Sequence, residues 1–216
     1  MKNDATEAHF GFTKNELRVL QGLSSPLRIQ KYLDSLPFNF EKKGDTHYSP
    51  RRVLREKKAH CFEAALLACA ALMVHGKEPM VLHLASLPYD DDHILVLYKE
   101  NGYLGAISKT NHSTLRFRDP IFKTVRELAL SYFHEYFINT TGKKTLVGYS
   151  NAVNLKRFGL NWLTAEEELF EMDYLLMALP HSPFIPKGNE NLIRNADHME
   201  RKAGEHAEWS TKHRGT

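Results

Sequence analysis

Residues 60–76 read HCFEAALLACAALMVHG, and nearly every side chain from Phe62 to Val74 is apolar. A helix that is apolar around its whole circumference must pack against neighbours on more than one side. Gly76 is a natural residue to end it, because glycine readily adopts the left-handed conformation that follows a helix. The stretch therefore predicts a central, buried helix around which the rest of the chain packs.

Cys61 stands at the start of this helix. A thiol in the first helical turn faces unpaired backbone N–H groups and the positive end of the helix dipole, and both favour the thiolate. The second cysteine, Cys69, lies roughly 12 Å farther along the axis at 1.5 Å per residue, which is too far for a disulfide. We therefore expect Cys69 to be structural and Cys61 to be a candidate nucleophile, with a small buried hydrophobe as the alternative for Cys61.

Two apolar runs follow the helix, from Met80 to Leu87 and from His93 to Tyr98, and turn-forming residues separate them. Both runs are typical of strands. Asn101-Gly102 is a strong signal for a two-residue hairpin loop, so residues 103–107 should pair antiparallel with the strand that begins at His93.

The hairpin loop also sets the pairing of the two strands. Counting back from the loop puts His93 opposite Thr110, with Ser108 one diagonal step away on the same face. Asn111 would point to the other face unless the strand has ended before it. Ser108 and Asn111 are therefore both open as neighbours of the His93 ring.

Acyl transfer needs a nucleophile, a base within hydrogen-bonding reach, a group that orients the base, and donors for the oxyanion. Cys61 and His93 supply the first two by residue type and expected position. The hydroxyl of Ser108 or the amide of Asn111 is the candidate for orienting the imidazole. The backbone N–H of Cys61 is a candidate oxyanion donor. Read alone, His93 would be a satisfied core or surface histidine, so its role depends on that of Cys61.

This order of elements resembles the transglutaminase-like branch of the papain-like cysteine superfamily. The resemblance covers roughly residues 50–110 and is carried by Cys61-Phe62-Glu63-Ala64, Asp92-His93-Ile94-Leu95-Val96 and Gly102-Tyr103. Members of that family usually carry an Asp-Pro pair in the third of these elements. Here Ser108-Lys109 occupies that slot, and Asp119-Pro120 lies farther along the chain.

The resemblance implies an α+β fold in which a central helix packs on a small antiparallel sheet with flanking helices. It also implies a thiol-dependent hydrolase or acyltransferase that acts on amide, peptide or other acyl bonds of a peptide, protein or small substrate. The alternative is a catalytically inactive interaction module on the same fold, with the basic segment 51–58 as its contact surface. That segment is most simply a solvated helix face.

The flanking elements follow from capping signals. Thr13, Ser25-Pro26 and Ser49-Pro50 each predict the start of a short helix before the central one. Asp119-Pro120 should break the chain before a helix at about residues 122–137, and the capping-box pattern at residues 164–167 predicts a last helix that ends near residue 179.

The domain expected from these elements spans residues 1–185. Residues 186–216 are polar and charged, with few large apolar side chains, so we expect a mobile, partly helical tail outside the core.

Composition narrows the class of protein. The chain has 216 residues, 42% of them apolar, and a net charge of only +3, so we expect no nucleic acid partner. Glycine-rich phosphate loops and paired metal-ligand motifs are missing, which predicts no cofactor. No stretch approaches the ~20 apolar residues that span a bilayer, and the N-terminus lacks a secretory signal, so we expect a cytoplasmic protein without a membrane partner.

Overall fold

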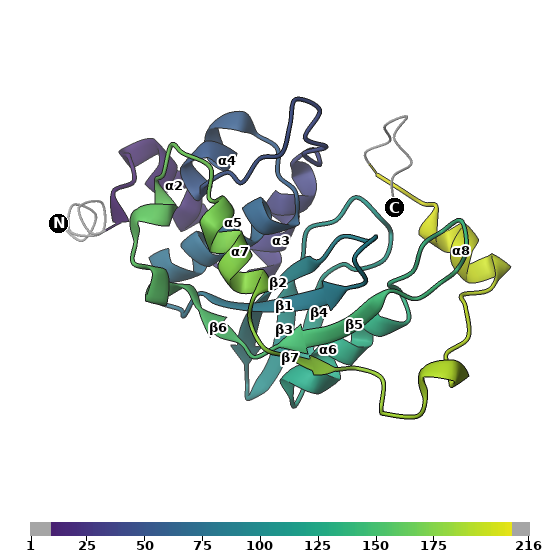
Figure 1. Cartoon of the computed structure of the whole chain (residues 1–216). Helices are drawn as coiled ribbons and strands as arrows, with labels where there is room; N and C mark the ends of the chain where they lie inside the picture. Colours follow the sequence, from purple (N-terminus) through teal and green to yellow (C-terminus); the bar gives the residue numbers. More distant parts are fainter. Residues whose placement is uncertain (1–9, 209–216) are drawn as a thin grey trace.

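A computed structural model describes residues 10–208 as a mixed α+β fold. The central helix is α5 (Cys61–Val74), and every residue from Phe62 to Met73 is buried. Helices α2 (Lys14–Gly22), α3 (Pro26–Ser35) and α4 (Pro50–Glu56) surround it on one side of the sheet (Figure 1). The buried central helix predicted from residues 60–76 is thus confirmed.

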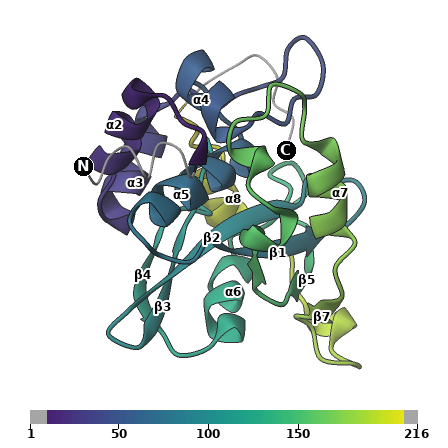
Figure 2. The same ribbon diagram turned by 90° about the vertical axis from the view of Figure 1, so that its left-hand side faces the viewer.

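The sheet is open and antiparallel, in the order β4-β3-β2-β1-β5-β7, with β6 paired to β1. Alternate side chains of β2 enter two cores, one against α5 and one against α6, which lies on the opposite face (Figure 2). Because both faces are covered, β2 is a continuous apolar run rather than an alternating one. The strands are β1 (Met80–Ser86), β2 (His93–Glu100), β3 (Tyr103–Ile107), β4 (Arg118–Phe122), β5 (Leu146–Ser150), β6 (Val153–Asn154) and β7 (His181–Pro183).

The capping signals before the central helix are confirmed. The side chains of Thr13, Ser25 and Ser49 each accept a hydrogen bond from a backbone N–H in the first turn of α2, α3 and α4. The hairpin is confirmed as well, because Glu100 pairs with Tyr103 in the predicted register. β3 ends at Ile107, so the ladder does not reach as far as Thr110.

The region after β3 differs from the prediction. Residues 118–122 form strand β4 instead of a break, and α6 (Val125–Phe133) is shorter than the predicted helix at 122–137. Pro120 fits within β4 because β4 lies at the edge of the sheet, where a missing N–H donor leaves no strand partner unsatisfied. Thr124 caps α6 with a full capping box.

The predicted last helix also begins later than expected. Residues 155–158 and 161–163 form short 3₁₀ turns, and α7 (Phe170–Met177) starts six residues after Thr164. The capping box does not form, because Thr164 ends the second 3₁₀ turn and the Glu167 side chain accepts a hydrogen bond from the Glu166 N–H at 3.1 Å. The next residue, Glu168, accepts a hydrogen bond from the His47 N–H at 2.5 Å and pairs with Arg52 at 2.7 Å.

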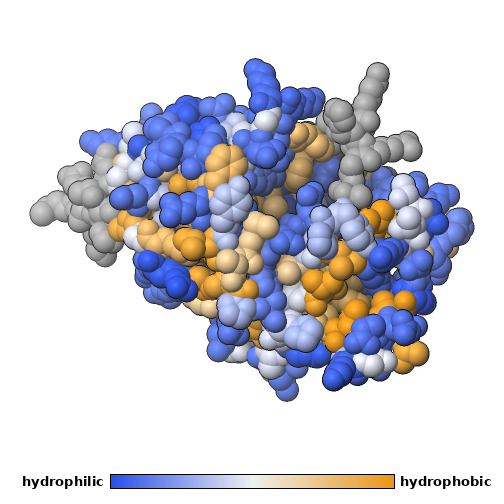
Figure 3. All heavy atoms as spheres, in the orientation of Figure 1, coloured by the Kyte–Doolittle hydropathy of each residue, from blue (hydrophilic) through white to orange (hydrophobic). Residues whose placement is uncertain are grey.

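Helix α7 buries only a narrow face, through Met172 and Leu176. Tyr174, Leu175 and Met177 are exposed, and Figure 3 shows apolar side chains over α7 and beside β5 and β7 on this side of the molecule.

The segment expected to form a mobile tail is instead attached to the domain as far as residue 208. It contains a 3₁₀ turn (Glu190–Leu192) and α8 (His198–Gly204). The Ser113 N–H donates to the His206 carbonyl at 2.9 Å, and the Glu208 N–H donates to the Asn111 carbonyl at 2.7 Å. These contacts are mostly polar and involve the backbone, so a low content of apolar side chains did not reveal them. Residues 209–216 of the expected tail lie outside the described residues.

Glu63 fixes the start of α5. Its side chain is fully buried and accepts hydrogen bonds from Asn39 Nδ2 at 3.1 Å, Thr46 Oγ1 at 2.8 Å, and the N–H groups of Tyr48 at 3.2 Å and His60 at 3.0 Å. One carboxylate therefore holds the loop between α3 and α4 against the first turn of the central helix.

We expect Glu63→Ala to lower the free energy of unfolding by about 3 kcal/mol or more, because several buried donors lose their acceptor together. Urea denaturation followed by circular dichroism measures the loss. The matched control is Glu127→Ala, which removes an exposed capping carboxylate from α6 and should cost about 1 kcal/mol. Equal losses in the two variants would contradict the role assigned to Glu63.

Candidate active site

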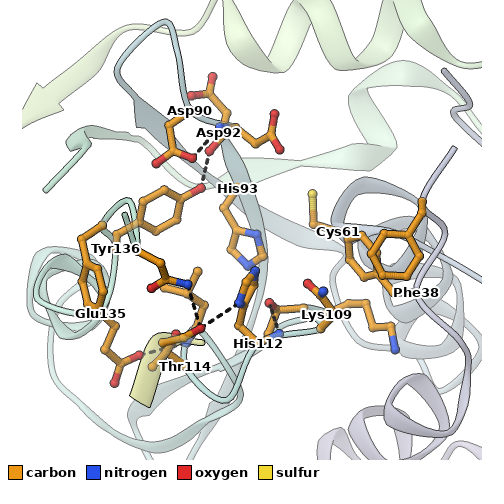
Figure 4. A pocket seen from close by; sticks show the side chains of 18 of the residues that line it. Phe38, Cys61, Asp90, Asp92, His93, Lys109, His112, Thr114, Glu135 and Tyr136 are labelled. Atoms are coloured by element: carbon orange, nitrogen blue, oxygen red, sulfur yellow. Dashed lines mark hydrogen bonds between the residues drawn. The ribbon is translucent and has the colours of Figure 1, made fainter. Parts of the chain in front are cut away.

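Cys61 and His93 line the same pocket, which has a volume of about 310 Å³. Cys61 is the first residue of α5 and is partly exposed, whereas His93 is the first residue of β2 and is buried (Figure 4). The helix start and the strand start predicted from the sequence therefore meet at one cavity.

The environment of the Cys61 sulfur favours the neutral thiol. Burial, and then the negative charges of Asp173 and Asp91, raise the pKa of Cys61 to about 12, although hydrogen bonds from the backbone N–H groups of Phe62 and Ile94 act in the opposite direction. The first turn of the helix thus acts toward the thiolate as expected, through the Phe62 N–H, but burial and the two carboxylates outweigh this contribution. The N–H from Ile94, the residue after His93, also shows that the sulfur lies at the start of β2.

Ser108 orients the His93 ring. Its hydroxyl donates to the Leu115 carbonyl at 2.6 Å, and the same oxygen lies 2.8 Å from His93 Nε2. A hydroxyl has a single proton, so toward the ring Ser108 can only accept. His93 Nε2 therefore carries the proton, and Nδ1 is left with a free lone pair.

His93 is a neutral base. Burial, and then the charge of His83, lower the pKa of His93 to about 4. At neutral pH its Nδ1 can therefore accept a proton, and the Cys61–His93 pair at rest is a thiol beside an uncharged imidazole.

Ser108 is itself fixed by Gln30, a buried residue of α3. The Gln30 Nε2 donates to the Ser108 carbonyl at 2.8 Å, and the Ser108 N–H donates to Gln30 Oε1 at 3.0 Å. The amide continues the β3 hydrogen-bonding pattern beyond the end of the strand. No sequence signal indicated Gln30, because it lies 78 residues before Ser108.

Asn111, the other candidate for orienting the base, lines the pocket. Within residues 10–208 its side chain makes no hydrogen bond to His93, and its carbonyl accepts the Glu208 N–H. The structure thus brings Cys61, His93 and Ser108 together and leaves Asn111 elsewhere on the pocket wall.

Lys109 follows Ser108 and turns away from the pocket. Its ammonium group donates to the carbonyls of Leu33 at 2.8 Å and Leu36 at 2.6 Å, at the C-terminal end of α3. Burial lowers the pKa of Lys109 to about 8. The side chain therefore satisfies helix carbonyls and directs its charge toward the end of α3.

Glu41, His47 and His60 are the described residues that could hold a metal ion, since one ligand atom from each lies within 4.8 Å of the others. His47 Nδ1 is buried without a hydrogen-bond partner, and its Nε2 lies 3.0 Å from Asp173. His60 Nε2 donates to the Thr46 carbonyl at 2.8 Å, a bond that ligation through that nitrogen would break. No short sequence motif marks this cluster, because its residues are brought together by the loop between α3 and α4.

The basic segment 51–58 is largely engaged within the molecule. Each of its arginines makes an ion pair, and Lys57 ends α4 in a left-handed conformation. Its ion pairs are Arg51–Glu16 at 2.9 Å, Arg52–Glu168 at 2.7 Å and Arg55–Glu166 at 2.8 Å. Most of the segment's charge therefore already has an acidic partner.

No protein-family model matches this sequence, and no curated protein matches it significantly. Along residues 10–208, no helix combines the length and the apolar character needed to cross a membrane. The fold and the pocket define the protein as an α+β protein in which a cysteine and a histidine share one cavity.

The His93 environment predicts a specific pH dependence of stability. The pKa of His93 is about 4 in the folded protein and 6.5 in a model peptide, so the unfolded chain binds the proton at higher pH. The contribution of His93 is fully present above pH 6.5 and is lost as the pH falls through 4, by roughly 3 kcal/mol. Urea denaturation of wild type and His93→Gln at pH 7 and pH 4 measures it. A difference between the two proteins that stays constant over this range would contradict the burial of a neutral His93.

Proposed function

We propose that the protein is a thiol-dependent hydrolase or acyltransferase that acts on amide, peptide or other acyl bonds. Cys61 is the nucleophile, His93 is the general base and acid, and Ser108 positions the imidazole. The observation that carries the proposal is the hydrogen bond from His93 to Ser108, which leaves the Nδ1 lone pair of a pocket-lining histidine free to accept a proton.

The reaction begins as the Cys61 sulfur attacks the acyl carbon and its proton passes to His93 Nδ1. The imidazolium then returns this proton to the departing amine or alcohol, which leaves a thioester on Cys61. Water or an amine next attacks the thioester and loses its proton to His93, and Cys61 is released as a thiol. A base whose pKa is low is weak but fully available at neutral pH.

The oxyanion formed in both steps needs donors. The N–H of Cys61 belongs to the first turn of α5, where backbone N–H groups have no acceptor within the helix. It supports charge at the acyl oxygen together with the positive end of the helix dipole.

The transglutaminase-like fold is part of the same proposal. It is supported by the position of Cys61 at the head of a central helix, by His93 at the head of the neighbouring strand, and by the hairpin that brings Ser108 to the ring. The alternative to the enzyme is a catalytically inactive interaction module on the same fold, and the following experiment distinguishes the two.

We expect p-nitrophenyl acetate to transfer one acetyl group to Cys61, in a Cys69→Ala background that leaves a single thiol. Intact-protein mass spectrometry and p-nitrophenolate release measure the reaction. His93→Asn should slow acylation about a hundredfold or more, because it removes the base, and Ser108→Ala should slow it about tenfold by releasing the ring.

Cys61→Ser is the control for the site of acylation, and circular dichroism shows that each variant is folded. Acylation of Cys61 at the rate of an ordinary thiol, with no effect of His93→Asn, would rule out the enzyme and favour the inactive module.

A further inference from the structure

The pocket around Cys61 carries more acidic than basic side chains. Its acidic residues come from the loop before β2, from the loop after α3 and from the end of α6 (Figure 4). They are Asp90, Asp91, Asp92, Glu41 and Glu135.

Three of these carboxylates are already engaged. Asp90 accepts from the Thr145 hydroxyl. Asp92 accepts from the Ser86 N–H at 2.6 Å and lies 3.3 Å from His83 Nε2. Glu135 pairs with Arg118 at 2.6 Å. All three carboxylates therefore already have partners within the protein and are less available to a ligand.

Asp91 and Glu41 are different. Asp91 is partly accessible to solvent, and within residues 10–208 its side chain makes no hydrogen bond or ion pair. Glu41 uses one carboxylate oxygen to accept the Thr46 N–H at 2.6 Å, and that oxygen is 3.8 Å from His60 Nε2. Among the described residues, its second oxygen has no hydrogen-bond or ion-pair partner and remains available to a ligand.

Asp91 interacts electrostatically with Glu41 and with the Cys61 sulfur. Burial, and then the charges of Asp90, Glu41 and Asp92, raise the pKa of Asp91. The charge of Asp91 in turn contributes to the raised pKa of Cys61. Negative potential is therefore concentrated where a thiolate has to form.

The basic residues of the pocket are engaged with other partners. His93 is neutral, and the Lys109 ammonium donates to carbonyls at the end of α3. His112 donates through Nδ1 to the Gly204 carbonyl at 3.2 Å.

We propose that the pocket takes acyl substrates that carry an ammonium or guanidinium group, and that Asp91 and Glu41 hold this cation beside the Cys61 sulfur. The inference deepens the proposed function by naming the substrate class of the same site. The volume of about 310 Å³ accommodates one such side chain.

Charged thiol reagents test the proposal directly. In the Cys69→Ala background, with EDTA present so that no metal ion occupies the Glu41, His47 and His60 cluster, Cys61 is modified by two methanethiosulfonates, one with a trimethylammonium group and one with a sulfonate. The ratio of the two rates is divided by the same ratio for 2-mercaptoethanol, which removes the intrinsic difference between the reagents.

We expect the cationic reagent to be favoured by about tenfold or more at low ionic strength. Asp91→Asn and Glu41→Gln should each lower the ratio about threefold, and salt should lower it in the wild type. Gln at position 41 keeps a carbonyl that can accept the Thr46 N–H. The matched control is Asp119→Asn, which removes an exposed carboxylate from β4 outside the pocket and should leave the ratio unchanged.

A normalised ratio near one in the wild type would overturn the cation preference, and a ratio insensitive to both pocket variants would overturn the assignment to Asp91 and Glu41. Failure of the enzyme proposal is a separate result, since a high ratio with uniformly slow labelling keeps the cation preference. Fast labelling of Cys61 with a ratio near one would instead support the activated thiol and overturn the cation preference.

Discussion

The buried carboxylate of Glu63 is the interaction on which the pocket depends. It lies in the first turn of α5 and accepts hydrogen bonds from the loop between α3 and α4, including Asn39 and Thr46. The loop supplies Glu41 to the pocket wall, and the helix supplies Cys61. A buried acceptor with several donors cannot be exchanged for water without leaving those donors unpaired, so the loop and the helix start are fixed together.

Local signals in the sequence predicted the elements that carry the candidate site. The Asn101-Gly102 loop fixes the pairing of β2 with β3, which keeps the predicted register from Glu100–Tyr103 to Val96–Ile107. This register brings Ser108 near His93. Turn chemistry acts within a few residues, which is why it can be read from one sequence. The Gln30 amide that holds Ser108 could not be predicted, because its partner is set by the packing of α3 on β3 and not by neighbouring residues.

The same limit explains why the start of the helix does not by itself decide the protonation state of Cys61. The helix dipole is a local property and favours the thiolate, whereas burial and the charges of Asp173 and Asp91 come from distant parts of the chain. Desolvation penalises a charge more than one helix end stabilises it. The sequence thus predicts where the sulfur lies but not its protonation state, and the polar contacts of residues 186–208 escaped prediction for a similar reason.

A neutral serine in place of an acidic residue has a chemical consequence. Ser108 selects the Nε2–H tautomer of His93 as a carboxylate would, but it brings no negative charge to stabilise an imidazolium. A serine that positions the imidazole therefore favours a neutral thiol beside a neutral imidazole in the resting protein. Charge then has to develop during attack, on a sulfur whose pKa is already raised by burial and by the charges of Asp173 and Asp91. The imidazolium that forms on His93 at the same moment has a hydroxyl, and not a carboxylate, to stabilise it.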